Sequence, residues 1–501
     1  MAAEPVSTAH TYGGWRRPAS AGILGLGSLG TGLLIAGLVF VVIIDMFAGL
    51  LPAFVTALVL GGGLLLVLRR DKHGKNLLTR SAARSAWWWT RSSRANIYRS
   101  GPTGRTDWGT FQLPGLAASL RLSEHEDAYG RRFALLQAPS TRTYTVVLGS
   151  DPDGSALVDQ EQINLWVARW GNWLASLADE PSMEAVSVTI ETAPDTGHRL
   201  RQEVDANLDP QAPDLARHVL REVVETYPVG SSTVRAYIAL TFNAQARSGS
   251  RRREPAEMGH ELGVRLPALV DRLQETGAGA VVPLPAQELC EVVRVAYDPP
   301  SRVLFDQARA EGAAPDLSWS DVGPSATQAS WAGYHHEGSF SRTWAMTGAP
   351  RGNVQASILA RLLAPHGSVD RKRVTLLYRP VDPARAAAIV ESDLRAATFR
   401  ASGRRQAQAR DALDVRWAAA AADAEASGAG LVNFGVLVTA TVTGPERMPD
   451  ADATIDNMSA ASRIRLRPVY GSQDSAFAAA LPLGLVLRKH LQIPAELGEK
   501  L

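Results

Sequence analysis

The chain of 501 residues carries 52 Lys+Arg against 50 Asp+Glu, and 46% of its residues are hydrophobic. This length predicts two or three folded units, and the apolar content excludes a wholly disordered chain. The single cysteine, Cys290, excludes an intramolecular disulfide and a multi-thiolate metal cluster. The net charge of +2 is unevenly distributed. Residues 69–105 hold ten Lys/Arg and one Asp, a local charge of +9, which leaves −7 for the rest of the chain.

Residues 21–68 form an apolar stretch in which Asp45 is the only ionisable residue. Since about 20 residues cross a bilayer as a helix, this stretch predicts a hairpin of two transmembrane helices with its turn after Asp45. Lys and Arg flank the stretch on both sides and are missing from the turn. The positive-inside rule then predicts a two-span protein of the inner, cytoplasmic membrane, with both termini in the cytoplasm and residues 1–20 as a cytoplasmic tail.

The basic segment at residues 69–105 combines arginines with a run of three tryptophans. Cations and indole rings together suit the headgroup layer beside a span, so the segment predicts binding to an anionic lipid membrane. Nucleic acid is the competing ligand, through phosphate contacts and base stacking, and the neighbouring apolar stretch favours lipid. The predicted membrane-interface residues are Arg69, Arg70, Lys72, Lys75, Arg80, Arg84, Trp87, Trp88, Trp89 and Arg91.

Beyond residue 105, apolar periodicities of two and of three to four alternate along the chain. In the first half, strands are predicted at residues 143–150, 186–192, 233–242 and 278–284, with helices at 157–178, 214–226, 254–275 and 286–295. In the second half, strands are predicted at 326–333, 339–346, 373–379, 431–442 and 464–470, with helices at 354–363, 382–426 and 450–462.

Each half therefore shows the order strand, helix, strand, helical insert, strand, helix, strand. This order predicts an α+β fold with two split βαβ (ferredoxin-like) cytoplasmic units after the transmembrane hairpin, at residues 106–310 and 311–501. The second insert, residues 382–426, has many arginines and few bulky apolar residues, so we expect a projecting helical arm, either solvated or docked on a partner.

Linear motifs for catalysis are missing from the sequence. It contains no GxxxxGK[ST] phosphate loop, no HExxH and no GxSxG. His335 and His336 are adjacent, which puts them on opposite faces of a strand, so a hairpin tip is favoured over a metal site. Cys290 falls in a predicted buried helix face, as a small hydrophobe. We therefore expect a non-enzyme without a catalytic, cofactor-binding or metal site.

Several stretches resemble a family of actinobacterial membrane proteins found with conjugative-transfer genes, some of them described as type VII secretion components. The matching segments are YGGWRRP (12–18), YRSGP (98–102), DAYG (127–130), ETAPDTG (191–197), AYDP (296–299) and VTLLYRP (374–380). The resemblance spans most of the chain. It implies a place in a secretion or conjugation complex.

The segment GSQDSAFAAALPLG (471–484) is similar to the end of the N-terminal domain of conjugative type IV secretion ATPases, where it precedes the nucleotide-binding domain. This resemblance implies a chain that lacks the motor and docks a separate ATPase. The predicted docking residues are Phe477, Leu481, Pro482, Leu483 and Gly484, and the alternative is that they close the core of the second unit.

We therefore expect a non-catalytic structural subunit of a conjugative, type IV-like secretion apparatus, whose partners are a secretion ATPase and other subunits of the apparatus. Assembly with further copies of the chain is left open. Two alternatives remain: an accessory membrane subunit of a type VII secretion complex, and a membrane-tethered DNA-binding protein that uses residues 69–105 and the arginine-rich arm.

Overall fold

The computed structural model describes residues 10–15, 27–68, 77–104, 111–152, 154, 157–195, 197–226, 232–245, 251–313, 315–350, 352–402 and 409–491. The predicted interface residues Arg69, Arg70, Lys72 and Lys75 lie outside these ranges. The described helices are α1 (Gly27–Ala48), α2 (Leu50–Leu68), α3 (Leu77–Ser92), α4 (Gln160–Ser176), α5 (His198–Asn207), α6 (Asp214–Thr226), α7 (Pro255–Leu273), α8 (Ala286–Tyr297), α9 (Ser301–Ala310), α10 (Ala360–Leu363), α11 (Pro383–Ser402), α12 (Ala409–Ala426), α13 (Met448–Ala461) and α14 (Gln473–Ala479).

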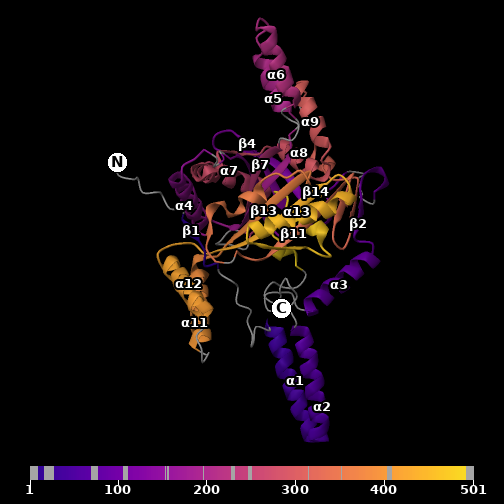
Figure 1. Cartoon of the computed structure of the whole chain (residues 1–501), viewed down its shortest axis with the longest axis vertical. Coiled ribbons are helices and arrows are strands. Elements are labelled where there is room, and N and C mark those ends of the chain that lie inside the picture. Colours follow the sequence, from indigo (N-terminus) through magenta and orange to yellow (C-terminus); the bar gives the residue numbers. More distant parts are fainter. Residues whose placement is uncertain are drawn as a thin grey trace.

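One antiparallel sheet of 13 strands forms the body, with the order β2-β9-β10-β11-β14-β13-β6-β7-β5-β4-β3, while β15 pairs with β11 and β8 with β5 (Figure 1). A separate pair joins β1 to β12. The strands are β1 (Thr11–Tyr12), β2 (Ile97–Arg99), β3 (Arg121–Glu126), β4 (Arg132–Ala138), β5 (Thr143–Asp151), β6 (Met183–Pro194), β7 (Ser232–Asn243), β8 (Ala280–Pro283), β9 (Ala326–Ala329), β10 (Tyr334–His336), β11 (Ser339–Gly348), β12 (Val354–Gln355), β13 (Arg371–Pro380), β14 (Val432–Val442) and β15 (Arg465–Pro468).

The sheet contains the same arrangement twice. In the first half the spatial order is β8-β5-β7-β6, and in the second it is β15-β11-β14-β13. Both follow the order of a split βαβ unit, in which the first strand lies between the fourth and the third, and the second strand lies at the edge beside the third. Each unit also begins with an added hairpin strand, β4 before β5 and β10 before β11.

The two units share the sheet through β6 and β13, the second strand of each unit. These strands pair from Lys372 opposite Thr192 to Tyr378 opposite Val186. The predicted boundary near residue 310 therefore does not separate two sheets.

One face of the sheet is covered by helices. In the first unit α4 and α7 pack over the cluster that contains Leu148, Ile238 and Leu266. In the second unit α10 and α13 cover the cluster of Trp344 and Ile455. Leu376 contacts both clusters, so the helix layer is continuous across the junction.

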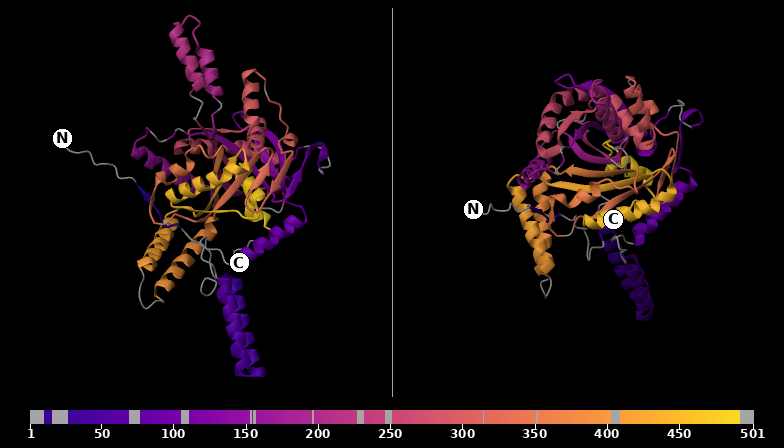
Figure 2. Two further views of the ribbon diagram at one scale, coloured as in Figure 1. Left: turned by 45° about the vertical axis from the view of Figure 1, so that its right-hand side comes forward. Right: turned by 45° about the horizontal axis from the view of Figure 1, so that its top comes forward.

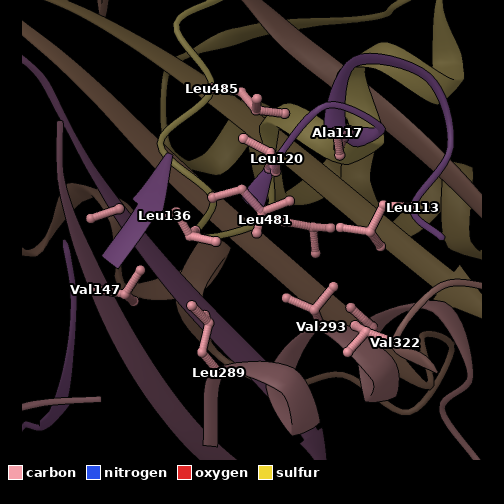
Figure 3. Packing of buried hydrophobic residues seen from close by; sticks show 14 of the residues in the cluster. Leu113, Ala117, Leu120, Leu136, Val147, Leu289, Val293, Val322, Leu481 and Leu485 are labelled. Carbon is pink, nitrogen blue, oxygen red and sulfur yellow. The ribbon is translucent and has the colours of Figure 1, made fainter. Parts of the chain in front are cut away.

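The opposite face lies inside a curl of the sheet. Leu136 of β4 and Tyr334 of β10, from the two ends of the sheet, belong to one apolar cluster with Val293 of α8 and Leu481 of the C-terminal segment. Figure 3 shows Leu113, Leu136, Leu289 and Leu481 converging in this cluster. The C-terminal segment thus fills the inner face.

Two helical hairpins project from the body at equivalent positions, between the second and third strands of each unit (Figures 1 and 2). The first consists of α5 and α6, and the second of α11 and α12. The second is the projecting arm predicted for residues 382–426.

The predicted transmembrane hairpin is not found. Within the described part of the chain, no helix is long and apolar enough to cross a membrane. The predictions of a two-span protein and of a location in the cell membrane with cytoplasmic termini are therefore wrong.

Candidate functional site

The inner face of the sheet is lined by hydroxyl groups that pair with one another across neighbouring strands. Because side chains alternate along a strand, the same strands carry apolar residues toward the helix layer. The hydroxyl pairs are Thr145–Thr241 (3.0 Å), Thr189–Thr375 (3.1 Å), Thr343–Thr439 (2.9 Å) and Ser341–Thr441 (2.7 Å).

The C-terminal segment, residues 471–485, uses this polar face as its binding surface. The hydroxyl of Thr375 donates to the carbonyl of Ala480 at 2.8 Å, and that of Thr241 donates to the carbonyl of Gly484 at 3.3 Å. The amide side chain of Gln473 exchanges two hydrogen bonds with the backbone of Thr343. The hydroxyl face is therefore engaged by the chain itself.

The five predicted docking residues lie in or beside this interior. Phe477, Leu481 and Leu483 are at most 1% exposed and belong to the inner apolar cluster. Pro482 is also buried, and Gly484 is partly buried against the hydroxyls of Thr145 and Thr241. In this conformation Phe477, Leu481 and Leu483 fill an inner core to which both units contribute, and they are not accessible to a partner.

A buried ionic centre lies at the junction of the two units. The carboxylate of Glu191 accepts a hydrogen bond from Nη1 of Arg371 at 3.0 Å and another from Nε of Arg373 at 2.9 Å. Burial alone would raise the pKa of Glu191, but the charges of Arg371 and Arg373 outweigh it and lower that pKa. The guanidinium of Arg373 also lies 5.2 Å from the centre of the Phe477 ring. The two buried arginines thus share one carboxylate, and Nη1 and Nη2 of Arg373 have no hydrogen-bond partner among the described residues.

His336 is fully buried beside this centre. Its Nδ1 donates to the carbonyl of Tyr297 at 2.5 Å, because a carbonyl can only accept. Its Nε2 therefore accepts from the hydroxyl of Ser341 at 2.7 Å. Burial lowers the pKa of His336 to about 4, although the hydrogen bond to Tyr297 opposes the shift. The neutral ring is a fixed part of the core.

The neighbouring His335 lies in β10, opposite Phe340, and Glu337 begins the turn of the β10–β11 hairpin that the sequence predicted. His335 is exposed while His336 is buried, so the two rings lie on opposite faces. Over the described residues, no group of three or more His, Cys, Asp or Glu is placed to hold a metal ion. Cys290 is buried, and burial raises its pKa to about 12, which keeps the thiol protonated and unreactive.

A cleft of about 600 Å³ lies between β3, the start of α8 and the end of the loop after α9. Glu291 forms an ion pair with Arg309, and Glu124 lies 3.6 Å from Arg132 and accepts the backbone N–H of Ala286. Glu288 also lines the cleft, and burial raises its pKa, as does the nearby charge of Glu291. The three carboxylates outnumber the two arginines, so the wall of the cleft is acidic.

The described members of the predicted membrane-interface set lie on α3. Trp87 is half-buried against the body, whereas Trp88 and Trp89 are 68% and 71% exposed. Arg84 and Arg91 are exposed, and Arg80 is partly buried. Of the three tryptophans, Trp87 therefore packs against the body, and Trp88 and Trp89 face the solvent.

Sequence reasoning missed the apolar surface of α6, and the signal was present in the sequence. Leu215, Val219 and Val223 recur every four residues, with Leu220 beside them. None of the residues of α6 is buried, and Leu215 is 75% exposed. We call these four side chains the α6 stripe. An amphipathic helix normally buries such a face, so the α6 stripe is an unused packing surface.

A family model matches the N-terminal part of the chain. Residues 19–79 match the model of a domain of unknown function, DUF8461. No curated protein matches the chain.

Proposed function

We propose that this chain is a non-catalytic docking subunit of a conjugative, type IV-like secretion apparatus, and that it binds a separate ATPase through the α6 stripe. The observation that carries the proposal is the exposed apolar face of α6, on a hairpin that projects from the body (Figure 1). Membrane attachment is not part of the proposal.

The α6 stripe has the geometry of a helix that lies in a partner's groove. Leu215, Val219 and Val223 follow one another at one-turn spacing, which is how such a helix anchors itself. Arg217 and Arg221 lie beside the stripe and Glu222 lies across the helix from them, giving a polar rim to an apolar centre. A partner that covers the stripe removes apolar surface from water, which favours association.

The interior supports a structural role. The inner hydroxyls bind the C-terminal segment, Glu191 forms ion pairs with two buried arginines, and Cys290 remains a thiol. These groups hold the curled sheet together.

The choice of an ATPase as partner comes from the resemblance of residues 471–484 to the end of the N-terminal domain of conjugative ATPases. The sequence carries that segment without a GxxxxGK[ST] loop. This resemblance is the reason for proposing an ATPase on another chain as the partner.

Co-purification with the secretion ATPase encoded nearby tests the proposal. The wild-type chain should retain the ATPase, and L215S/V219S should weaken the association by at least about tenfold, since each apolar contact contributes more than about 1 kcal/mol. The matched control is Val264→Ser on α7, another exposed apolar side chain at 62% exposure. Failure of the folded wild-type chain to bind the ATPase, or equal binding by L215S/V219S, would contradict the proposal.

A further inference from the structure

The helix α3 and the strand β2 carry a concentrated positive charge. Residues 77–99 contain five arginines and no Asp or Glu. Arg84, Arg91, Arg94 and Arg99 are all exposed. Among the described residues, no carboxylate pairs with Arg84 or Arg91. This surface therefore keeps its charge available for an anionic partner.

An aromatic stack fixes the orientation of α3 on the body. The ring of Trp87 meets that of Trp331 edge to face at 6.2 Å, and Trp331 stacks on Tyr470 at 5.7 Å with an angle of 14°. Gly471, with a φ of +79°, brings the backbone close to Trp331, where a Cβ would lie only 2.8 Å from the ring. With Trp87 held inward, the neighbouring Trp88 and Trp89 point to solvent.

Cation and aromatic alternate along one face of α3. Arg84, Trp88 and Arg91 follow at spacings of four and three residues, which places them on the same side of the helix. Trp89 follows Trp88 by one residue and therefore lies about 100° further around the helix. We call Arg84, Trp88, Trp89 and Arg91 the α3 surface.

We propose that the α3 surface binds single-stranded nucleic acid. Guanidinium groups neutralise successive phosphates, and the exposed indole rings stack on unpaired bases without reading their sequence. Duplexes present no free base faces to these rings, so the single strand is the preferred form.

Trp88 lies between two arginines on one face of α3. Its exposed ring shares this face with Arg84 and Arg91, so a base that stacks on the ring lies between two guanidinium groups that can bind the neighbouring phosphates. A polyanion with flat bases satisfies both kinds of group at once.

Fluorescence anisotropy of a labelled oligothymidylate with the full chain tests this proposal. We expect saturable binding that weakens steeply with salt, and weaker binding of a duplex of equal length. R84Q/R91Q should reduce the slope of log affinity against log salt by about 1.4, at about 0.7 for each lost phosphate contact of a single strand. W88A/W89A should weaken binding by about tenfold or more, the loss expected when base stacking is removed.

The control variant removes the same kinds of group from the α11–α12 hairpin. Phe399 is 77% exposed, and Arg395 and Arg400 flank it on α11, so R395Q/F399A/R400Q should leave the affinity unchanged. Absence of binding at low salt, equal affinity for duplex, or equal loss in the control would overturn the proposal. Binding to phosphatidylserine vesicles without binding to the oligonucleotide would overturn it in favour of lipid.

Discussion

Glu191 and Arg373 are direct partners across the junction of the two units, with Oε2 of the carboxylate 2.9 Å from Nε of the guanidinium. One residue is on β6 and the other on β13, so this ion pair, shared with Arg371, joins two halves of the chain that are separated by about 180 positions. The junction makes one sheet of two similar units.

Glu191→Gln should destabilise the protein by about 3–5 kcal/mol, because it leaves two buried arginines without their counter-ion. Urea unfolding measures this change. The exposed pair of Arg169 and Glu275, 3.8 Å apart, provides the control, since Glu275→Gln should cost at most about 1 kcal/mol. A loss below about 1 kcal/mol in Glu191→Gln would show that the junction does not depend on this pair.

The carboxylate of Glu191 also makes the stability of the folded protein depend on pH in the acidic range. The pKa of Glu191 is lowered from its ordinary value of 4.5, so its contribution is complete above pH 4.5 and is lost as the pH falls through the folded pKa. The difference in stability between wild type and Glu191→Gln should therefore shrink only below pH 4.5.

Protonation of His336 should also destabilise the folded protein, and it should do so at a higher pH than protonation of Glu191. Its folded pKa is about 4 against an ordinary value of 6.5, so the neutral ring contributes fully above pH 6.5 and loses its contribution as the pH falls toward 4. The loss should amount to about 3 kcal/mol, from the size of the shift. His336→Asn should flatten the dependence of urea stability on pH between 6.5 and 4. An unchanged slope would show that His336 does not titrate as the structure requires.

Gly484 should tolerate no side chain. Its φ is +64°, and a Cβ would collide with the hydroxyls of Thr145 and Thr241 on the inner face. Gly484→Ala should destabilise the protein by about 2–5 kcal/mol through backbone strain and overpacking. Gly367 has open space around it, so Gly367→Ala should stay within about 0.5 kcal/mol of wild type in the same denaturation experiment. Equal stability of the two variants would contradict the described path of the C-terminal segment.

The α6 stripe should be dispensable for folding. Leu215 and Val219 are exposed, so L215S/V219S should change the free energy of unfolding by no more than about 0.5 kcal/mol. Thermal and urea unfolding of the purified chain measure this change. A loss of several kcal/mol would place the stripe in the core of the fold and remove it as a docking surface.

Local periodicity predicted most strands and helices of the body, including β5, β7, α7 and the interrupted helical arm of α11 and α12. It missed α5, α9 and the β3–β4 hairpin. The helix α5 and the strand β3 are short and polar, but β4 is apolar and buried. The pairing of β6 with β13 depends on residues far apart in sequence, which periodicity does not report. The apolar run at residues 21–68 was interpreted as two spans, and the described helices do not support that interpretation.

The interior was the hardest part to predict. Thr189, Thr375 and Glu191 alternate with apolar residues, a pattern that ordinarily marks the solvent side of a sheet. Here that side of the sheet is covered by residues 471–485, so its polar residues are buried. For the same reason the docking residues predicted from the LPLG segment lie in the interior of the protein. The α6 stripe is visible in the sequence as Leu and Val residues at helical spacing. The structure adds that no other element of the described chain covers these side chains.

Site-specific photo-crosslinking from position 215 tests the central claim most directly. A photoreactive amino acid at Leu215 should capture the secretion ATPase encoded nearby, and the same group at Val264 on α7 should not. Crosslinking of the ATPase from position 264 but not from position 215, or from neither position while the two proteins co-purify, would contradict docking through α6.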